Sequence, residues 1–281
     1  MQNIFIKYVN YKNMHFSEKF GFLVLFIFLL MTIFPSLIAT HDPLEQDIIS
    51  RLQNPSINHF FGTDELGRDI FSRCVYGAYT SVSTAFIAVI FALIVGVSTG
   101  LFSGFSGGTI DEVLSRFNDV LFSFPGIIIA MALIAVTGQN PISVALVIGL
   151  VDTPILFRVT RAVTLQVKVL PYVDAVKSAG ASKYYIMFKT VLPNCSTEIF
   201  VQALLIATRA IIIESSLSFL GLGIPPPSPS WGSMLSIGRS YLYRMVWYGI
   251  MPGIFIMMLV ISLQFVSKYI QRISKYNIFL K

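Results

Sequence analysis

Three ionisable residues stand within long, otherwise uncharged stretches of this sequence: Asp152, Arg209 and Glu214. Charged side chains at membrane depth usually face the interior of a helix bundle or a water-filled path, and they usually have a partner. Arg209 and Glu214 are five positions apart, which is a poor spacing for a pair on one helix, so each is expected to find its partner on another helix or chain. We interpret all three as candidates for a translocation pathway. For Asp152, a position near the cytoplasmic membrane surface is the alternative.

The other chemistry-bearing residues do not form a recognisable active site. The sequence contains no GxxxxGK[ST] phosphate loop and no HExxH metal motif. His15, His41 and His59 are too scattered along the chain to indicate a metal site. Cys74 and Cys195 have no CxxC spacing, so they are interpreted as small apolar packing residues. The sequence therefore predicts no catalytic residue, no metal and no cofactor.

The composition is that of a membrane protein. Of the 281 residues, 55% are hydrophobic and 12% are charged, and the mean hydropathy is +0.74. A soluble domain has about 25% charged residues, so a soluble enzyme is excluded. The net charge of +6 could suggest nucleic acid as a partner, but the 20 Lys and Arg residues lie between long uncharged runs. That pattern is typical of basic membrane-protein loops, and no nucleic acid is expected to bind.

The apolar runs predict an all-α integral membrane protein with six transmembrane helices. A helix needs about 20 apolar residues to cross a bilayer, and the turn sequence at 138–141 divides one long run into two. The predicted spans cover 20–39, 79–101, 119–137, 141–160, 196–220 and 246–267. The first is interpreted as a retained anchor, because its apolar run is longer than the roughly 7 to 15 residues of a signal core.

The distribution of cations predicts the orientation of the bundle. With six crossings both termini lie on one side of the membrane. That side carries 14 of the 20 Lys and Arg residues, the other carries five, and Arg209 lies within a span. The positive-inside rule then places both termini in the cytoplasm. The predicted segments are a cytoplasmic 1–19, a first transmembrane helix 20–40, an extracytoplasmic 41–75, a five-helix core 76–267 with a cytoplasmic loop 161–195, and a cytoplasmic tail 268–281.

Four glycines in the second predicted span are spaced four residues apart: Gly96, Gly100, Gly104 and Gly108. This spacing puts them on one helix face and allows another helix to approach closely. We expect that helix to belong to the same chain, with homodimerisation as the alternative.

The loop 161–195 predicts two short helices at an angle. A helix beginning at Tyr172 should end at Gly180, which can adopt the left-handed conformation. Ser182 can cap a second helix, and Pro193 is expected to end that helix before the next span. The exposed aromatic residues in the second helix are suited to contact with a partner protein, although packing at the membrane interface is the alternative.

This loop resembles the EAA coupling loop of ABC importer permeases. The match consists of an acid, a small residue, a glycine and a Leu-Pro pair, with Asp174 in place of the usual Glu and Val176 in place of the second Ala. The resemblance implies an ATPase-coupling role for six residues: Asp174, Ala175, Gly180, Ala181, Leu192 and Pro193.

Three further segments resemble permeases of the dipeptide, oligopeptide and nickel importer family. They are the sequence FGTDELGRD at 61–69, SFLGLG at 218–223 and PSPSWG at 227–232. One departure is Tyr79, where relatives usually have a basic residue.

The resemblance implies a type I ABC importer permease fold and a permease subunit that moves peptides or nickel and other metal chelates by alternating access. Since the chain has no ATPase site of its own, this function requires two cytoplasmic ABC ATPases, together with a second homologous permease, an extracytoplasmic solute-binding protein and membrane lipid. An ion-coupled secondary transporter is the main alternative, and a membrane enzyme is another.

Overall fold

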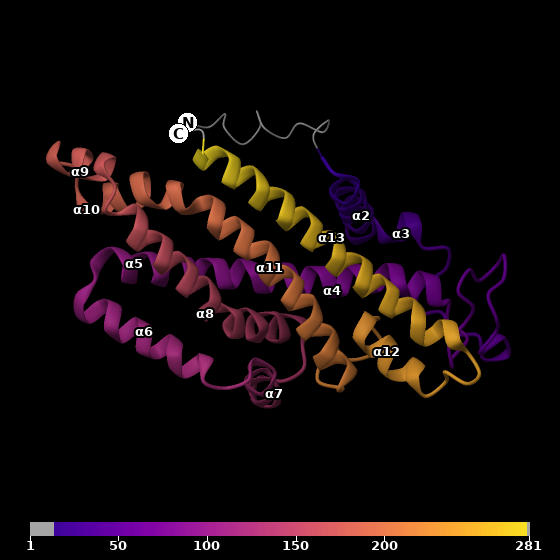
Figure 1. Ribbon diagram of the computed structural model, residues 1–281. Helices are drawn as coiled ribbons and strands as arrows, with labels where there is room; N and C mark the ends of the chain where they lie inside the picture. The colour runs from indigo at the N-terminus through magenta and orange to yellow at the C-terminus, as the bar shows by residue number, and fades with distance from the viewer. Residues whose placement is uncertain (1–13, 280–281) are drawn as a thin grey trace.

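The computed structural model of this protein describes the backbone of residues 14–279 and the side chains of residues 14–273. Within that range the chain forms helices and no β-strand. The helices, labelled as in Figure 1, are α2 (Phe16–Ile33), α3 (Pro35–Ile38), α4 (Ile70–Ala92), α5 (Ser98–Ser106), α6 (Gly108–Phe122), α7 (Gly126–Thr137), α8 (Pro141–Val167), α9 (Pro171–Ser178), α10 (Lys183–Tyr185), α11 (Leu192–Phe219), α12 (Trp231–Arg239) and α13 (Val246–Phe279).

Five of these helical segments are long and apolar enough to cross a membrane, and the count becomes six if the bent pair α6 and α7 forms one span. One of the five is the continuous helix Ile70–Ser106, in which a π turn at Leu93–Val97 joins α4 to α5. The all-α, multi-pass architecture predicted from the apolar runs is therefore confirmed.

The first span differs from the predicted 20–39. It begins at Phe16 and ends at Ile33, and the short helix α3 follows it. The break falls at Phe34, directly before Pro35. Proline has no N–H to donate and disfavours a helical conformation in the residue before it, so the helix ends there.

The second span begins at Ile70, nine residues before the predicted start and within the segment 41–75 assigned to a loop. The carboxylate of Asp69 caps the helix, accepting a hydrogen bond of 2.7 Å from the N–H of Ser72. Arg73 made this stretch look too polar for a span, yet it is buried beside Asp64, with 3.4 Å between Nε and Oδ2.

The third predicted span, 119–137, is not one straight helix. The structure has α6 and α7 at 88° to each other, with the break before Pro125. Charges in α6 made residues 108–118 look like a loop, but ion pairs with α8 neutralise two of them: Arg161 Nη2 lies 2.7 Å from Asp111 Oδ2, and Arg158 Nη2 lies 2.9 Å from Asp119 Oδ1.

Helix α8 packs on α4, α5 and α11. A Cβ atom at Gly100 would lie 2.6 Å from the carbonyl oxygen of Phe157, and Gly96 and Gly104 approach α8 as closely. Packing within the chain is thus confirmed for three of the four glycines. Gly108 differs, because a Cβ there would have no atom of the described chain within 4 Å.

The side chain of Trp231 connects four helices in the largest apolar core. It is fully buried, and its indole N–H donates a hydrogen bond of 2.9 Å to the carbonyl of Cys74 on α4. Its ring makes edge contacts with Phe28 of α2 and Phe255 of α13. The motif around Trp231 therefore has a structural role in fixing α12 against the bundle.

The bundle has two distinct ends. The α9–α10 segment and the C-terminal part of α13 lie towards one end, whereas α12 and the chain between α3 and α4 lie at the other (Figure 1). Helix α8 runs to Val167, so it extends six residues beyond the predicted start of the cytoplasmic loop at 161.

Candidate functional site

The α9–α10 loop has the local geometry that the sequence predicts. Helix α9 spans Pro171–Ser178, and Gly180 has a φ of +83°. The hydroxyl of Ser182 accepts a hydrogen bond of 3.3 Å from the N–H of Tyr185 and caps the next helix. The two signals in the sequence, a glycine and a capping serine, therefore correctly predict where one helix ends and the other begins.

The loop has one apolar face that is buried and another surface that is free. Val173, Ile186 and Met187 are buried in a core cluster with residues of α8 and α11. The opposite surface exposes Asp174, Ala175 and Gly180, together with the rings of Tyr184 and Tyr185. The loop is thus fixed to its own chain on one side and can contact another protein on the other.

Pro193 does not end the second helix, contrary to the prediction. Residues Lys183–Phe219 form one continuous helical segment, with a π turn over Ile186–Val191. Proline cannot donate an N–H to the preceding turn, and a local widening of the helix is one way to accommodate such a defect. Leu192 and Pro193 therefore lie at the junction between the loop and the long helix α11.

Asp152 and Arg209 form an ion pair between α8 and α11. Arg209 Nε lies 3.1 Å from Asp152 Oδ1, which confirms that the partner of Arg209 is on another helix. Asp152 is fully buried near the middle of α8, whereas 52% of the Arg209 side chain is exposed. The second carboxylate oxygen of Asp152 has no hydrogen-bond partner among the described residues.

Glu214 is enclosed within the chain. It is fully buried, and its carboxylate accepts a hydrogen bond of 2.8 Å from the hydroxyl of Ser218 on the same helix. Arg209 is not its partner, as expected from their spacing. In this conformation Glu214 faces no open surface, and a role for it in the pathway stays a prediction.

The FGTDELGRD motif forms a tight, charged structure at the start of α4. Asp64 Oδ2 lies 2.6 Å from Arg68 Nε, and Arg68 also contacts Glu65 at 3.1 Å. Arg73 donates a hydrogen bond of 2.9 Å to the carbonyl of Pro43, 30 residues earlier in the chain. The motif thus folds residues 41–69 onto the N-terminus of α4.

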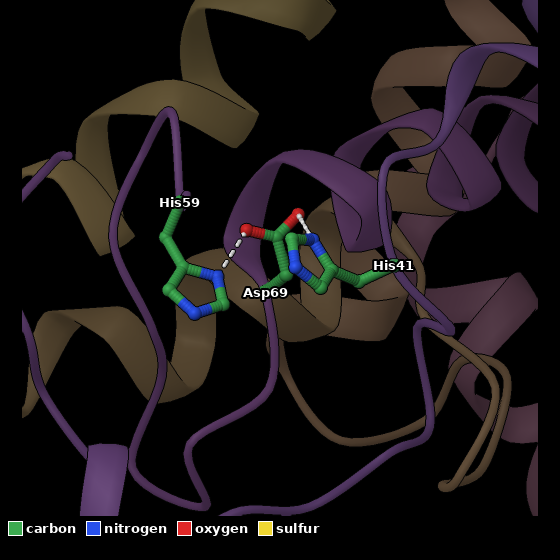
Figure 2. Close-up of side chains that lie close together, drawn as sticks. All are labelled: His41, His59 and Asp69. Atoms are coloured by element: carbon green, nitrogen blue, oxygen red, sulfur yellow. Dashed lines mark hydrogen bonds and ion pairs between the residues drawn. The ribbon is translucent and has the colours of Figure 1, made fainter. Parts of the chain in front are cut away.

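The interpretation of the histidines as scattered is wrong for two of the three. His15 lies at the N-cap of α2. The rings of His41 and His59, however, stack with their centroids 4.7 Å apart. Figure 2 shows both imidazoles turned towards the carboxylate of Asp69. No local spacing in the sequence indicated this cluster, because it depends on the fold of the 41–69 segment.

In a comparison with known families, the chain matches the model described as "Binding-protein-dependent transport system inner membrane component". It covers residues 96–275 of this chain. Those residues include the α9–α10 loop and the Asp152–Arg209 pair.

Several curated proteins are similar over most of the chain. A dipeptide transport system permease protein, DppC, of Alkalihalophilus pseudofirmus is 37% identical over 88% of this chain and 81% of its own length. A probable D,D-dipeptide permease, DdpC, of Escherichia coli is 38% identical over 82% and 77%. A glutathione permease, GsiD, of Pectobacterium atrosepticum is 36% identical over 75% and 70%.

Among solved structures, a chain of the MetNI methionine ABC transporter in an inward-facing conformation has a similar fold. The TM-score is 0.59 with 18% identity, and the match covers 72% of this chain and 96% of the other. At this identity the likeness concerns the fold alone.

Proposed function

Since this chain belongs to the family of binding-protein-dependent transport system inner membrane components and is a permease subunit of an ABC importer, we propose that its cargo is a short peptide. The observation that supports this cargo is that similar curated proteins carry dipeptide, peptide or glutathione in their names. Nickel and metal chelates have no such support. The comparisons favour an ABC importer permease over an ion-coupled secondary transporter, and the fold is that of type I ABC importer permeases.

The transporter that we propose contains two cytoplasmic ATPases, a second homologous permease and an extracytoplasmic solute-binding protein. The need for separate ATPases is supported by the sequence, which has no phosphate-binding loop. Alternating access would then occur between the two permeases, in the surrounding membrane lipid, as the ATPases close and open.

The α9–α10 loop is proposed as the docking site for one ATPase. Asp174, Ala175 and Gly180 are exposed, and Asp174 lies in the first turn of α9, where a carboxylate suits the positive end of the helix dipole. Ala181 lies beside this surface, and Leu192 and Pro193 lie where the loop passes into α11. Because α10 continues into α11 without a break, a displacement of the loop would move the long helix as a rigid element.

The exposed face of α11 is proposed to line the pathway together with the partner permease. Arg209 and Ile212 are exposed and Ser216 is partly exposed, and the spacing of three and four residues puts them on one side of the helix. A charged side chain that faced lipid at this depth would be costly. A second permease or water in a path must therefore cover this face. Asp152, buried behind Arg209, would hold the guanidinium in place.

We also propose that both termini are cytoplasmic. The distribution of cations supports this orientation, and so does the position of the α9–α10 loop at the same end of the bundle as the C-terminal part of α13 (Figure 1). The α3–α4 connection and α12 would then lie outside.

Cysteine labelling of intact cells tests this orientation. Ser178 lies within the proposed coupling surface, at the end of α9, and Ser228 precedes α12; both are exposed. An impermeant thiol reagent is expected to label Ser228→Cys and to spare Ser178→Cys. The native Cys74 and Cys195 are fully buried, so background labelling should be low. Labelling of Ser178→Cys from outside would reverse the orientation.

Competition uptake tests the cargo. Cells that have the intact transporter and no other peptide importer should accumulate a labelled dipeptide, and deletion of this chain should abolish that uptake. Unlabelled di- and tripeptides should compete, whereas the free amino acids should not. Unchanged dipeptide uptake after the deletion, or competition by free amino acids alone, would contradict a peptide cargo.

A further inference from the structure

The side chains of His41, His59 and Asp69 come together from three separate parts of the chain. His41 follows α3, His59 lies in the loop before the FGTDELGRD motif, and Asp69 caps α4. His59 Nδ1 lies 3.0 Å from Asp69 Oδ1, and His41 Nδ1 lies 3.9 Å from Asp69 Oδ2. One ligand atom from each residue can be chosen so that all three lie within 4.8 Å of one another.

We propose that these three residues form a binding site for one divalent transition-metal cation of the zinc, nickel and copper class. Two imidazoles and one carboxylate are a donor set suited to these cations, and poorly suited to Mg²⁺ or Ca²⁺, which prefer oxygen ligands. Water would complete the coordination. This proposal does not depend on the nature of the cargo.

The cluster must contract to hold such a cation. At metal–ligand distances of about 2.1 Å, the ligand atoms of a tetrahedral site lie about 3.4 Å apart, whereas the three chosen atoms lie within 4.8 Å of one another here. The widest separation must therefore shorten by up to about 1.4 Å. The 3.0 Å between His59 and Asp69 already fits two neighbouring ligands of one metal.

The ligands are held in place by the first turn of α4. Ser72 donates its N–H to Asp69 Oδ2 at 2.7 Å, and its hydroxyl accepts the N–H groups of Thr40 at 3.2 Å and His41 at 3.0 Å. His59 is fixed by its own loop, where its N–H donates to the hydroxyl of Ser56 at 3.1 Å. Contacts of this kind orient the ligands before the metal arrives.

The charge and exposure of the cluster also suit a cation. Asp69 is fully buried, so its carboxylate needs compensation, while the His41 and His59 side chains are 36% and 19% exposed. Arg68 and Arg73, the nearby buried cations, already contact Asp64. A divalent ion can thus reach the site from solvent, and it would connect the start of the 41–69 segment to the N-terminus of α4.

Zinc titration of the assembled transporter, stripped of metal with a chelator, tests this site. The wild-type complex should hold one zinc ion more than the double variant His41→Gln/His59→Gln, by mass spectrometry of the metal content. Each single variant should weaken this site at least about tenfold in competition with a zinc indicator, because even indirect disturbance of a metal site costs 10- to 100-fold. Excess Mg²⁺ or Ca²⁺ should not displace the zinc.

His15→Gln is the matched control, because it also removes an imidazole, but at the N-terminus of α2 and outside the cluster. This variant should keep the wild-type zinc content.

His41→Gln alone is the variant least able to disturb folding, since its side chain is partly exposed. In the wild type, zinc should also raise the midpoint of thermal unfolding, and in the double variant it should not. Equal zinc content and affinity in the wild type and the folded double variant would overturn the proposal, leaving a carboxylate that only hydrogen-bonds His59 and lies near His41.

Discussion

Gly180→Trp is expected to reduce ATP-driven uptake by more than about tenfold while the chain still folds and reaches the membrane, because a contact between two proteins rather than the chain's own core is disturbed. The described chain has no atom within 4 Å of a Cβ placed at Gly180. An indole there would therefore project from the loop surface. If an ATPase docks on this surface, the added ring must separate the two proteins.

The backbone at Gly180 requires a control for strain. Its φ of +83° is unfavourable for residues with a Cβ, by about 1 to 2 kcal/mol. Gly180→Asn tolerates this conformation better than other substitutions and adds less bulk, so it should keep most of the uptake. Membrane content of both variants and their copurification with the ATPases should be measured with uptake. Normal uptake by the folded tryptophan variant would exclude this loop as the coupling element.

Arg209→Gln is expected to destabilise the chain by about 1 to 3 kcal/mol, the cost of leaving a buried acceptor without its partner, because only the Asp152 side of this pair is buried. It would leave the fully buried Asp152 without its one described partner. Asp152→Asn should cost less, because the half-exposed guanidinium of Arg209 can turn towards water. Thermal unfolding of the purified transporter should therefore rank Arg209→Gln below Asp152→Asn, and the double variant should recover much of the loss.

The double variant also separates folding from transport. If Arg209 lines the pathway, a stable Asp152→Asn/Arg209→Gln chain should still show slow uptake, because its charge is missing from the path. If Arg209→Gln and Asp152→Asn lower the thermal stability equally, the difference in burial between Asp152 and Arg209 has no effect on the free energy of unfolding. If the double variant takes up substrate at the wild-type rate, Asp152 and Arg209 serve only to pack α8 against α11, and Arg209 does not line the pathway.

The structure of the α9–α10 loop was predictable because its signals are local. Gly180 and Ser182 each act through their own backbone and the next turn. Two helix boundaries that were wrong involve partners outside the helix instead: in the second span the charge of Arg73 lies beside Asp64, and in α6 Asp111 pairs with Arg161, 50 residues later in the chain. Pro193 marks a helix end by local rules, but a π turn keeps the helix continuous.

The candidate sites divide in the same way. That Arg209 needs a partner on another helix followed from spacing, but its identity required the packing of α8 against α11. The cluster of His41, His59 and Asp69 forms only when residues 41–69 fold back onto α4, so its members looked unrelated in the sequence.

We propose that this chain carries peptides with energy supplied by separate ATPases. Proteoliposomes that contain the complete transporter, with the binding protein and a labelled dipeptide on one side and ATP on the side of the α9–α10 loop, measure it directly. Uptake should require ATP hydrolysis and should not respond to an imposed proton or sodium gradient. Dipeptide uptake that such a gradient drives in the absence of ATP would contradict the account.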